Sequence, residues 1–518
     1  MQEQVEIQFG TETEFGISRE RPEGLDVVAE AIALVGAATA PGVRRRWDYR
    51  CEDPHCDARG FRVKELMQDR DETNYFAQDA HRRLSADAIH SDLVLRNGAR
   101  FYNDHSHPEY STPECSTLLE QLQQDYCGDQ LLMECVRNLN QNSNNPVRLY
   151  KNNTDFCGHS YGCHENYLLP RRLPWEDLSD GIMAFLVTRQ IMCGSGKFGW
   201  EDEDKFLGPG FQIAQRSDFF FELQSIDTMQ RRPIVNTRDE PHANRQLYRR
   251  FHVILGDSNL SLFSTYLKIG TTVLVLQALL NGAPAKRAPH LADPLQALKN
   301  ISRDASWKWP CVAADGSQTT GLHVQREYLA LVREFCPNLL SEWVNVMDAW
   351  EKVLDDLERD PLSTADRLDW AAKFALIDKF RQAENLALED PWLPSLDLSY
   401  HWLDPQQGLF YGLMEQGAFK LPYPLAEITA HCLCPPSSTR AAVRGRCIEK
   451  FGGSVQAAQW DHLLLRGSQG TIKLDLCNLF DPQKIKHSLD VINEARTVDD
   501  LLRLEFATLN NGFNYAYV

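Results

Sequence analysis

The sequence predicts an α+β protein with one large domain, residues 1–434, and a small C-terminal domain, residues 435–518. Its 518 residues exceed what a single hydrophobic core usually supports. Within residues 1–270, strand-like segments alternate with Gly, Asn and Pro turns, and several helical stretches intervene. Residues 340–390 instead repeat apolar side chains every three or four positions, as amphipathic helices do.

The first predicted strand, residues 5–17, carries acidic side chains on one face. Odd positions are mostly apolar, and even positions include Glu12 and Glu14. These two carboxylates lie roughly 7 Å apart at a rise of about 3.4 Å per residue. Because like charges repel, this spacing suits a divalent cation shared with nucleotide phosphates. The alternative is the solvated face of an edge strand.

A second polar group is expected where residues 99–104 are extended. Arg100, Tyr102 and Asp104 then share a face, and a carboxylate beside a guanidinium and a phenol is a candidate general base or nucleophile. Pro108 is expected to end the regular pairing, so that Glu109 turns its carboxylate toward a metal. A structural Arg–Asp pair in a turn explains the pattern equally well.

Two further polar segments, residues 159–167 and 236–242, contain His164 and His242 inside dense polar clusters. Arg216 and Arg238 are suited to hold phosphate oxygens in a bidentate manner. Solvated salt bridges are the alternative for each arginine.

The remaining elements follow from the spacing of apolar residues and from stretches rich in polar residues or proline. An apolar stripe predicts a helix over 343–357, and a second amphipathic helix is expected over about 365–386. Residues 51–92 form a polar insertion, with the composition of a lid or binding loop. The Pro-Pro-Ser-Ser run at 435–438 predicts the break before the C-terminal domain.

Composition excludes several classes of function. A net charge of −18 argues against a general nucleic-acid binder. The apolar run 271–280 is too short to span a bilayer, and no secretory segment opens the chain. The 14 cysteines therefore indicate reduced thiols in the cytoplasm. Residues 194–199 match GxGxxG, but no clear strand precedes them and no suitably spaced acidic residue follows, so we reject a dinucleotide-binding fold.

Several motifs resemble the Pup ligase/depupylase family, which acts on the prokaryotic ubiquitin-like protein Pup. They are Gly10-Thr-Glu-Thr-Glu-Phe-Gly16, Asn97-Gly-Ala-Arg-Phe-Tyr102, His107-Pro-Glu-Tyr110, Ser160-Tyr-Gly-Cys-His-Glu-Asn-Tyr167, Gln215-Arg-Ser-Asp218 and Asn236-Thr-Arg-Asp-Glu-Pro-His-Ala243. The resemblance implies a glutamine synthetase-like fold, in which an antiparallel sheet cradles ATP and Mg²⁺ beside a small C-terminal domain.

The family contains ligases, which join Pup to a target lysine through a glutamyl phosphate, and depupylases, which hydrolyse that bond and deamidate a C-terminal Gln of Pup. The long insertion before Asn97 and the Asp104-His-Ser-His-Pro-Glu109 spacing resemble depupylases. Residues 151–155 and 161–164, with Thr112, read more like ligases. We favour the depupylase branch. A Pup ligase and a catalytically weak Pup-binding protein are the alternatives.

The resemblance also implies roles for individual residues. Asp104 would be the catalytic carboxylate, and Arg216 and Arg238 would stabilise the γ-phosphate or an oxyanion. Arg100, Thr112 and Trp460 would contact ATP. The residues implied to hold Mg²⁺ and the phosphates are Glu12, Glu14, Tyr102, Glu109, His164 and His242.

The implied partners are Pup, a small acidic protein that folds on binding, and pupylated proteins, with no nucleic acid and no membrane. A locally basic site would receive Pup, and the arginine pairs at 171–172, 231–232 and 249–250 are candidates.

Overall fold

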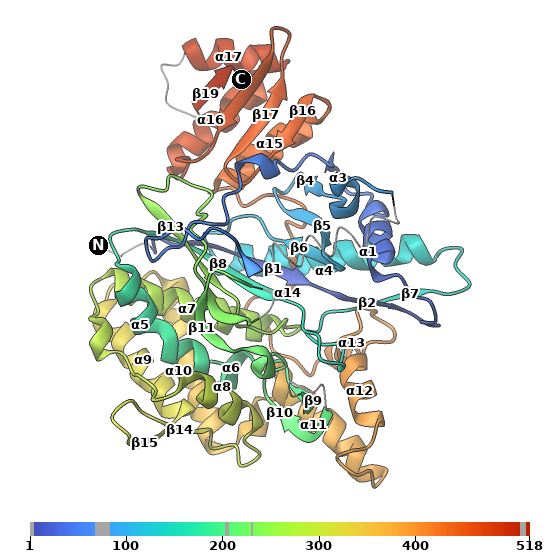
Figure 1. Ribbon diagram of the computed structural model, residues 1–518, viewed down its shortest axis with the longest axis vertical. Helices are drawn as coiled ribbons and strands as arrows, with labels where there is room; N and C mark the ends of the chain where they lie inside the picture. Colours follow the sequence, from blue (N-terminus) through green and yellow to red (C-terminus); the bar gives the residue numbers. More distant parts are fainter. Residues whose placement is uncertain (1–4, 68–82, 202–206, 229–230, 508–513, 518) are drawn as a thin grey trace.

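A computed structural model describes residues 5–67, 83–201, 207–228, 231–507 and 514–517 (Figure 1). Its centre is a nine-stranded sheet in the order β11-β12-β13-β8-β1-β6-β5-β4-β3. Neighbouring strands are antiparallel except β11 and β12, so the sheet is mixed at one edge rather than wholly antiparallel. The strands are β1 (Gln8–Glu14), β3 (Gly42–Arg44), β4 (Leu93–Leu95), β5 (Arg100–Asp104), β6 (His107–Ser111), β8 (Cys163–Pro170), β11 (Glu222–Ser225), β12 (Pro233–Asn236) and β13 (Tyr248–Val253).

The predicted alternation of the first strand is confirmed, but the strand is shorter than expected. Buried Phe9, Thr11 and Thr13 alternate with half-buried Glu12 and Glu14 in β1. The chain leaves the main sheet at Phe15, and β2 (Gly16–Arg19) pairs instead with β7 (Val147–Tyr150). The acidic face therefore belongs to a central strand, which excludes the edge-strand alternative.

Helices cover the sheet and supply most of the core (Figure 1). α7 (Leu262–Leu280) is the one described helix long and apolar enough to cross a membrane, yet 94% of that stretch is buried inside the protein, as in a core helix. The apolar run 271–280, which by itself is too short to span a bilayer, is the C-terminal part of this longer helix. Before residue 435, the other described helices of nine or more residues are α1 (Val27–Gly36), α4 (Leu118–Asn140), α5 (Trp175–Thr188), α8 (Pro294–Arg303), α9 (Gly321–Phe335), α10 (Ser341–Arg359), α11 (Asp369–Ala383) and α12 (Trp392–Tyr400).

The helix predictions for 343–357 and 365–386 correspond to α10 and α11. Trp343, Val346 and Trp350 of α10 are buried in the main core, as the apolar stripe predicts. The GxGxxG segment follows a helix, α6 (Gln190–Cys193), and runs into strand β9 (Lys197–Glu201), which pairs with β10 (Leu207–Gln212). It is therefore not the strand-to-helix turn of a dinucleotide-binding fold.

The C-terminal residues build a sheet of their own. Strands β16 (Val455–Ala458), β17 (His462–Arg466), β18 (Thr471–Asp475) and β19 (Asn514–Tyr517) pair in that order beside α15 (Arg440–Phe451), α16 (Pro482–Glu494) and α17 (Val498–Ala507). We call residues 440–517 the C-terminal module. Its core also includes Val43, Trp47 and Val94 from the first part of the chain, so the module packs onto the strand β3 side of the main sheet.

The polar insertion at 51–92 is described only in part. Its described residues are mostly irregular, with a short helix α3 (Ala86–His90) at the end, as expected of a loop with little helix. Residues 68–82 of the insertion lie outside the described residues.

Candidate active site

The central strands bring the predicted acidic residues to one face of the sheet. Residues directly opposite in antiparallel strands lie on the same face. Glu12 of β1 is opposite His164 of β8, and Glu14 is opposite Glu109 of β6. Glu109 in turn faces Tyr102 of β5. Segments far apart in the sequence thus contribute to one polar surface.

Glu12 lies between two histidines, of which only one was predicted. Nδ1 of His164 is 3.5 Å and Nε2 of His252 is 3.6 Å from Oε2 of Glu12. Burial and the charge of Arg250 lower the pKa of His252 to about 3, so its imidazole is neutral. Both of its ring nitrogens are buried without a hydrogen-bond partner among the described residues. In a neutral imidazole one of these two nitrogens carries a free lone pair, and such a donor beside a carboxylate fits a metal ion; the two imidazoles also suit ions softer than Mg²⁺, such as Zn²⁺.

A second group lies two residues further along β1. Glu14, Asp104 and Glu109 each place a carboxylate oxygen within 4.8 Å of the others. Burial and the negative charges of Asp104 and Glu12 raise the pKa of Glu109 well above its usual range. A cation would relieve this repulsion, and three oxygen ligands suit Mg²⁺ better than the histidine group does.

Tyr102, predicted to help hold Mg²⁺ and the phosphates, joins the acidic group through Glu109. Its hydroxyl donates to Oε1 of Glu109 at 2.6 Å, and burial raises its pKa well above the usual value. As a neutral phenol, Tyr102 orients the Glu109 carboxylate.

Asp104 ends β5 at a two-residue turn, 105–106. His105 adopts a left-handed backbone with φ of 55°, and its Nδ1 lies 3.1 Å from Oδ1 of Asp104. Although burial raises the pKa of Asp104, His105 and His90 outweigh it and hold that pKa below the usual range. Asp104 is therefore an ionised carboxylate at the edge of the acidic group. Pro108 does not end the pairing as expected: it lies inside β6 opposite Asn103, since its missing N–H falls near the hairpin end of the strand.

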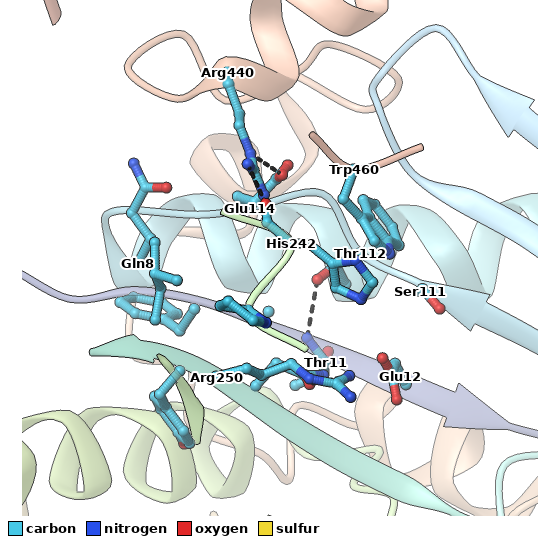
Figure 2. Close-up of a pocket in the computed structure, with 16 residues that line it drawn as sticks. Gln8, Thr11, Glu12, Ser111, Thr112, Glu114, His242, Arg250, Arg440 and Trp460 are labelled. Atoms are coloured by element: carbon cyan, nitrogen blue, oxygen red, sulfur yellow. Dashed lines mark hydrogen bonds and ion pairs between the residues drawn. The ribbon is translucent and has the colours of Figure 1, made fainter. Parts of the chain in front are cut away.

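Two connected cavities open on this face. The larger has a volume of about 430 Å³, and the smaller, of about 90 Å³, is drawn in Figure 2. They share Glu12, His242, Arg250 and Trp460. Trp460 comes from the C-terminal module, so the site is completed across the two parts of the chain. The predicted residues in the larger cavity are Glu12, Arg100, Tyr102, Asp104, Glu109, His164, Arg238, His242 and Trp460.

Thr112 lines the smaller cavity, and its Oγ1 already has a hydrogen-bond partner within the protein. It accepts a hydrogen bond from the backbone N–H of Thr11 at 3.0 Å, marked in Figure 2. A Cβ at Gly10 would lie 2.9 Å from the same oxygen, so only glycine permits this close approach.

Arg100 is fixed before any ligand arrives. Its guanidinium donates to Asp92 at 2.6 and 2.8 Å and stacks between the rings of Tyr102 and Trp47, 3.6 and 4.1 Å from their centroids. Asp92 is the last residue of the predicted insertion, which thus supports the cavity wall directly.

Two predicted residues lie apart from their expected partners. His242 is in neither carboxylate group of the described residues; it stands at the junction of the cavities, and burial lowers its pKa to about 4. Arg216 is fully buried and lines neither cavity, because its guanidinium donates to Ser160 and to the carbonyl of Ile254. Arg238 lines the larger cavity and donates to the carbonyl of Ile226 at 3.1 Å.

Sequence reasoning missed His252 of β13, and it named Arg250 of the same strand only as part of an arginine pair that would receive Pup, not as a residue of this site. Arg250 lines both cavities, and β13 lies beside β8 with His252 opposite Asn166. A period-2 reading of residues 248–253 would have put both on one face, but nothing in the sequence gives the neighbour of that strand.

Known structures share this architecture. The complex of Pup with its ligase PafA matches with a TM-score of 0.74 at 28% identity, covering 97% of this chain and 94% of that one. The Pup ligase PafA in complex with ADP matches with a TM-score of 0.70 at 32% identity, covering 84% and 95%. These likenesses confirm the predicted fold class.

The family model described as "Pup-ligase protein" matches residues 8–464, and the chain belongs to this family. A depupylase of Acidothermus cellulolyticus is 38% identical, over 95% of this chain and 98% of its own length. A Pup deamidase/depupylase of Mycobacterium tuberculosis is 39% identical, over 88% and 90%. A Pup–protein ligase of Mycolicibacterium smegmatis is 37% identical, over 74% and 89%. The predicted family is therefore confirmed, and the relatives of this chain are enzymes of Pup modification.

Proposed function

We propose that this protein is an ATP- and Mg²⁺-dependent depupylase and Pup deamidase. It would hydrolyse the isopeptide bond between the C-terminal Glu of a Pup-like protein and a substrate lysine, and deamidate a C-terminal Gln of Pup. Relatives named depupylase match 88–95% of this chain, whereas the ligases match 74%. The two-residue turn after Asp104 also agrees with the depupylase spacing.

The observation that carries the proposal is the ionised Asp104 carboxylate at the wall of the larger cavity, beside Glu14 and Glu109. A low pKa keeps this carboxylate available at neutral pH. It can attack the amide carbonyl or accept a proton from an attacking water. Both routes require the same anion, so they remain alternatives.

The nucleotide would lie along β1, with its base toward the smaller cavity. Trp460 offers an aromatic face there, and Arg100 and Arg250 supply positive charge on the phosphate side. The ADP complex of PafA, a similar fold, supports nucleotide binding in this cradle.

Glu12, His164 and His252, and separately Glu14 and Glu109, would hold metal ions. A bound cation would supply charge stabilisation for an oxyanion. Arg238, in the cavity wall, would donate to the same developing charge. Tyr102 keeps Glu109 oriented through its 2.6 Å hydrogen bond.

A Pup ligase is the second candidate, because ligases of the family match at 37–38% identity. The purified protein, with ATP and Mg²⁺, should release substrate from a Pup conjugate and convert Pup ending in Gln to Pup ending in Glu. Conjugate formation from Pup ending in Glu and a target, with ADP produced for each bond, would identify a ligase instead. Pup binding without either reaction would identify a sequestering protein.

Asp104→Asn tests the catalytic assignment. The amide is nearly isosteric but neither nucleophilic nor basic, so cleavage should fall by about 10²- to 10⁴-fold. Nucleotide affinity, measured by calorimetry, should stay close to wild type. Asp125→Asn is the control, because Asp125 lies on α4 and pairs with buried Lys151 away from both cavities. Cleavage by Asp104→Asn at the wild-type rate would contradict the assignment.

A further inference from the structure

Two guanidinium groups meet at one residue beside the acidic group. Nε of Arg216 donates to Oγ of Ser160 at 3.1 Å, and Nη2 of Arg232 donates to the backbone carbonyl of Ser160 at 2.8 Å. Arg216 is fully buried and Arg232 half-buried. Neither makes an ion pair with a carboxylate among the described residues, although acidic residues outnumber basic ones by 72 to 54.

The two charges disfavour each other. Burial and the charge of Arg232 lower the pKa of Arg216 to about 10, and burial lowers the pKa of Arg232. Glu14 partly offsets both charges and Asp257 partly offsets that of Arg216, but Oε2 of Glu14 already accepts from the N–H of Gly162 at 2.6 Å. Paired cations without a full counter-charge at a partly open position are suited to an anionic ligand.

Position along β1 indicates which ligand supplies the anion. The smaller cavity is lined by residues 8–12, the histidine group is at Glu12, and the acidic group is at Glu14. At about 3.4 Å per residue, Thr11 and Glu14 are separated by roughly 10 Å. The arginine pair belongs to the Glu14 end, because the charge of Glu14 acts on both guanidinium groups. An anion there is carried by the second substrate rather than by the nucleotide.

The chemistry of that substrate supplies such an anion. The proposed reaction acts on the side-chain carboxamide of a C-terminal residue, and the α-carboxylate of the same residue stays free. It lies only a few bonds from the carbonyl that reacts at Asp104. Arginine is the side chain best matched to a carboxylate, through two parallel N–H donors.

We propose that Arg232, with Arg216 behind it, binds the free α-carboxylate of the C-terminal residue that the protein modifies. The proposal rests on the proposed function for the identity of the substrate. It makes the pair a specificity site: only the last residue of a chain presents this carboxylate, so internal Gln and Glu residues are excluded.

The test compares two substrates on the wild type and three variants. The substrates are Pup ending in Gln with a free α-carboxylate, and the same protein ending in an α-carboxamide. For the wild type, the carboxamide should raise KM and Kd by about 10- to 100-fold. In Arg232→Gln that ratio should fall toward one. Arg333→Gln, a change at an exposed arginine paired with Glu351 at 2.7 Å, should keep the wild-type ratio.

A binding measurement tests this proposal independently of the proposed function. If the protein proves to be a ligase or inactive, the Kd ratio still reports on the arginine pair, measured by calorimetry with the same two proteins. Equal ratios for wild type and Arg232→Gln would overturn the proposal, as would loss of ATP affinity alone in Arg232→Gln, which would assign the pair to a phosphate. Arg232→Lys, which keeps the charge, should retain an intermediate ratio and guards against a variant that merely misfolds.

Discussion

At the scale of single residues, His242 and His252 show that a histidine in a recognisable motif need not be the one that lies beside Glu12. His242 stands in a recognisable motif but lies at the cavity junction, next to Arg250 and Arg440. His252 stands in no motif we recognised, yet it faces Glu12, and neither of its ring nitrogens has a hydrogen-bond partner among the described residues. A buried polar atom without a hydrogen bond identifies a candidate ligand better than proximity in sequence does.

Replacing each of these histidines by glutamine gives a matched pair of variants. His252→Gln should weaken metal affinity by at least about tenfold, because it removes one donor of the Glu12 group. His242→Gln should leave metal affinity near wild type and weaken nucleotide binding instead. Calorimetric titrations with Mg²⁺, Mn²⁺ and Zn²⁺, with and without ADP, measure both effects. The reverse outcome would restore His242 as the metal ligand.

At the scale of elements, the hairpin of β5 and β6 determines where Asp104 lies. Asp104 is opposite His107, Tyr102 is opposite Glu109, and the turn contains only two residues. Any change in turn length alters the direction of the Asp104 carboxylate relative to Glu109, because the register is set at the turn.

Inserting one glycine between residues 105 and 106 should therefore reduce cleavage by about 10²-fold or more, since small displacements of reacting groups are costly. Nucleotide affinity should change little, because Trp460 and Thr112 lie elsewhere. A glycine inserted beside Gly316, in the hairpin of β14 (Pro310–Val312) and β15 (Gln318–Thr320), is the control and should leave cleavage unchanged. Full activity after the first insertion would show that Asp104 does not need this register.

At the scale of the whole molecule, Glu114 joins the C-terminal module to the main sheet. Its carboxylate pairs with Arg440 at 2.7 Å and Arg444 at 2.6 Å, both from α15 (Figure 2 shows the Arg440 pair). Burial raises the pKa of Glu114, but Arg444 and Arg440 outweigh it and hold the pKa at about 2. Trp460 stays in the wall of both cavities only while this junction holds.

This shift predicts an acid sensitivity. A carboxyl group with a lowered folded pKa stabilises the protein above its unfolded pKa, near 4.5, and loses that contribution as pH falls toward 2. The loss is on the order of 3 kcal/mol. Melting temperature should therefore drop less steeply between pH 5 and 3 in Glu114→Gln than in the wild type, from a lower starting value. Glu334→Gln, which removes an exposed pair with Arg287, should follow the wild-type slope. Parallel slopes for Glu114→Gln and wild type would contradict the prediction.

Much of the site could be predicted because the signal is local. Alternation put Glu12 and Glu14 on one face, and likewise Arg100, Tyr102 and Asp104, and the strands confirm both faces. The position of Arg216 could not be predicted in this way: a charged side chain in a polar motif is expected to line a cavity, and only the fold shows that it is buried against Ser160.

The surroundings of the arginine pairs proposed to receive Pup could not be predicted from the sequence either. Arg171 pairs with Asp239, and Arg249 is buried with its guanidinium over the ring of Trp175. Arg250 instead lines both cavities, and Arg232 and Arg216 both donate to Ser160. Adjacent residues on a strand point to opposite faces, so a basic pair in the sequence need not form a basic patch.

The sequence by itself determined the strand and helix periods, the family and the acidic face, since each depends on neighbours within one segment or on motifs in order. Only the tertiary structure decided that His252 rather than His242 accompanies Glu12, that Tyr102 serves Glu109, and that Arg232 joins Arg216. These choices depend on which strands become neighbours and in what register, and strand pairing is fixed by long-range burial that no single segment encodes.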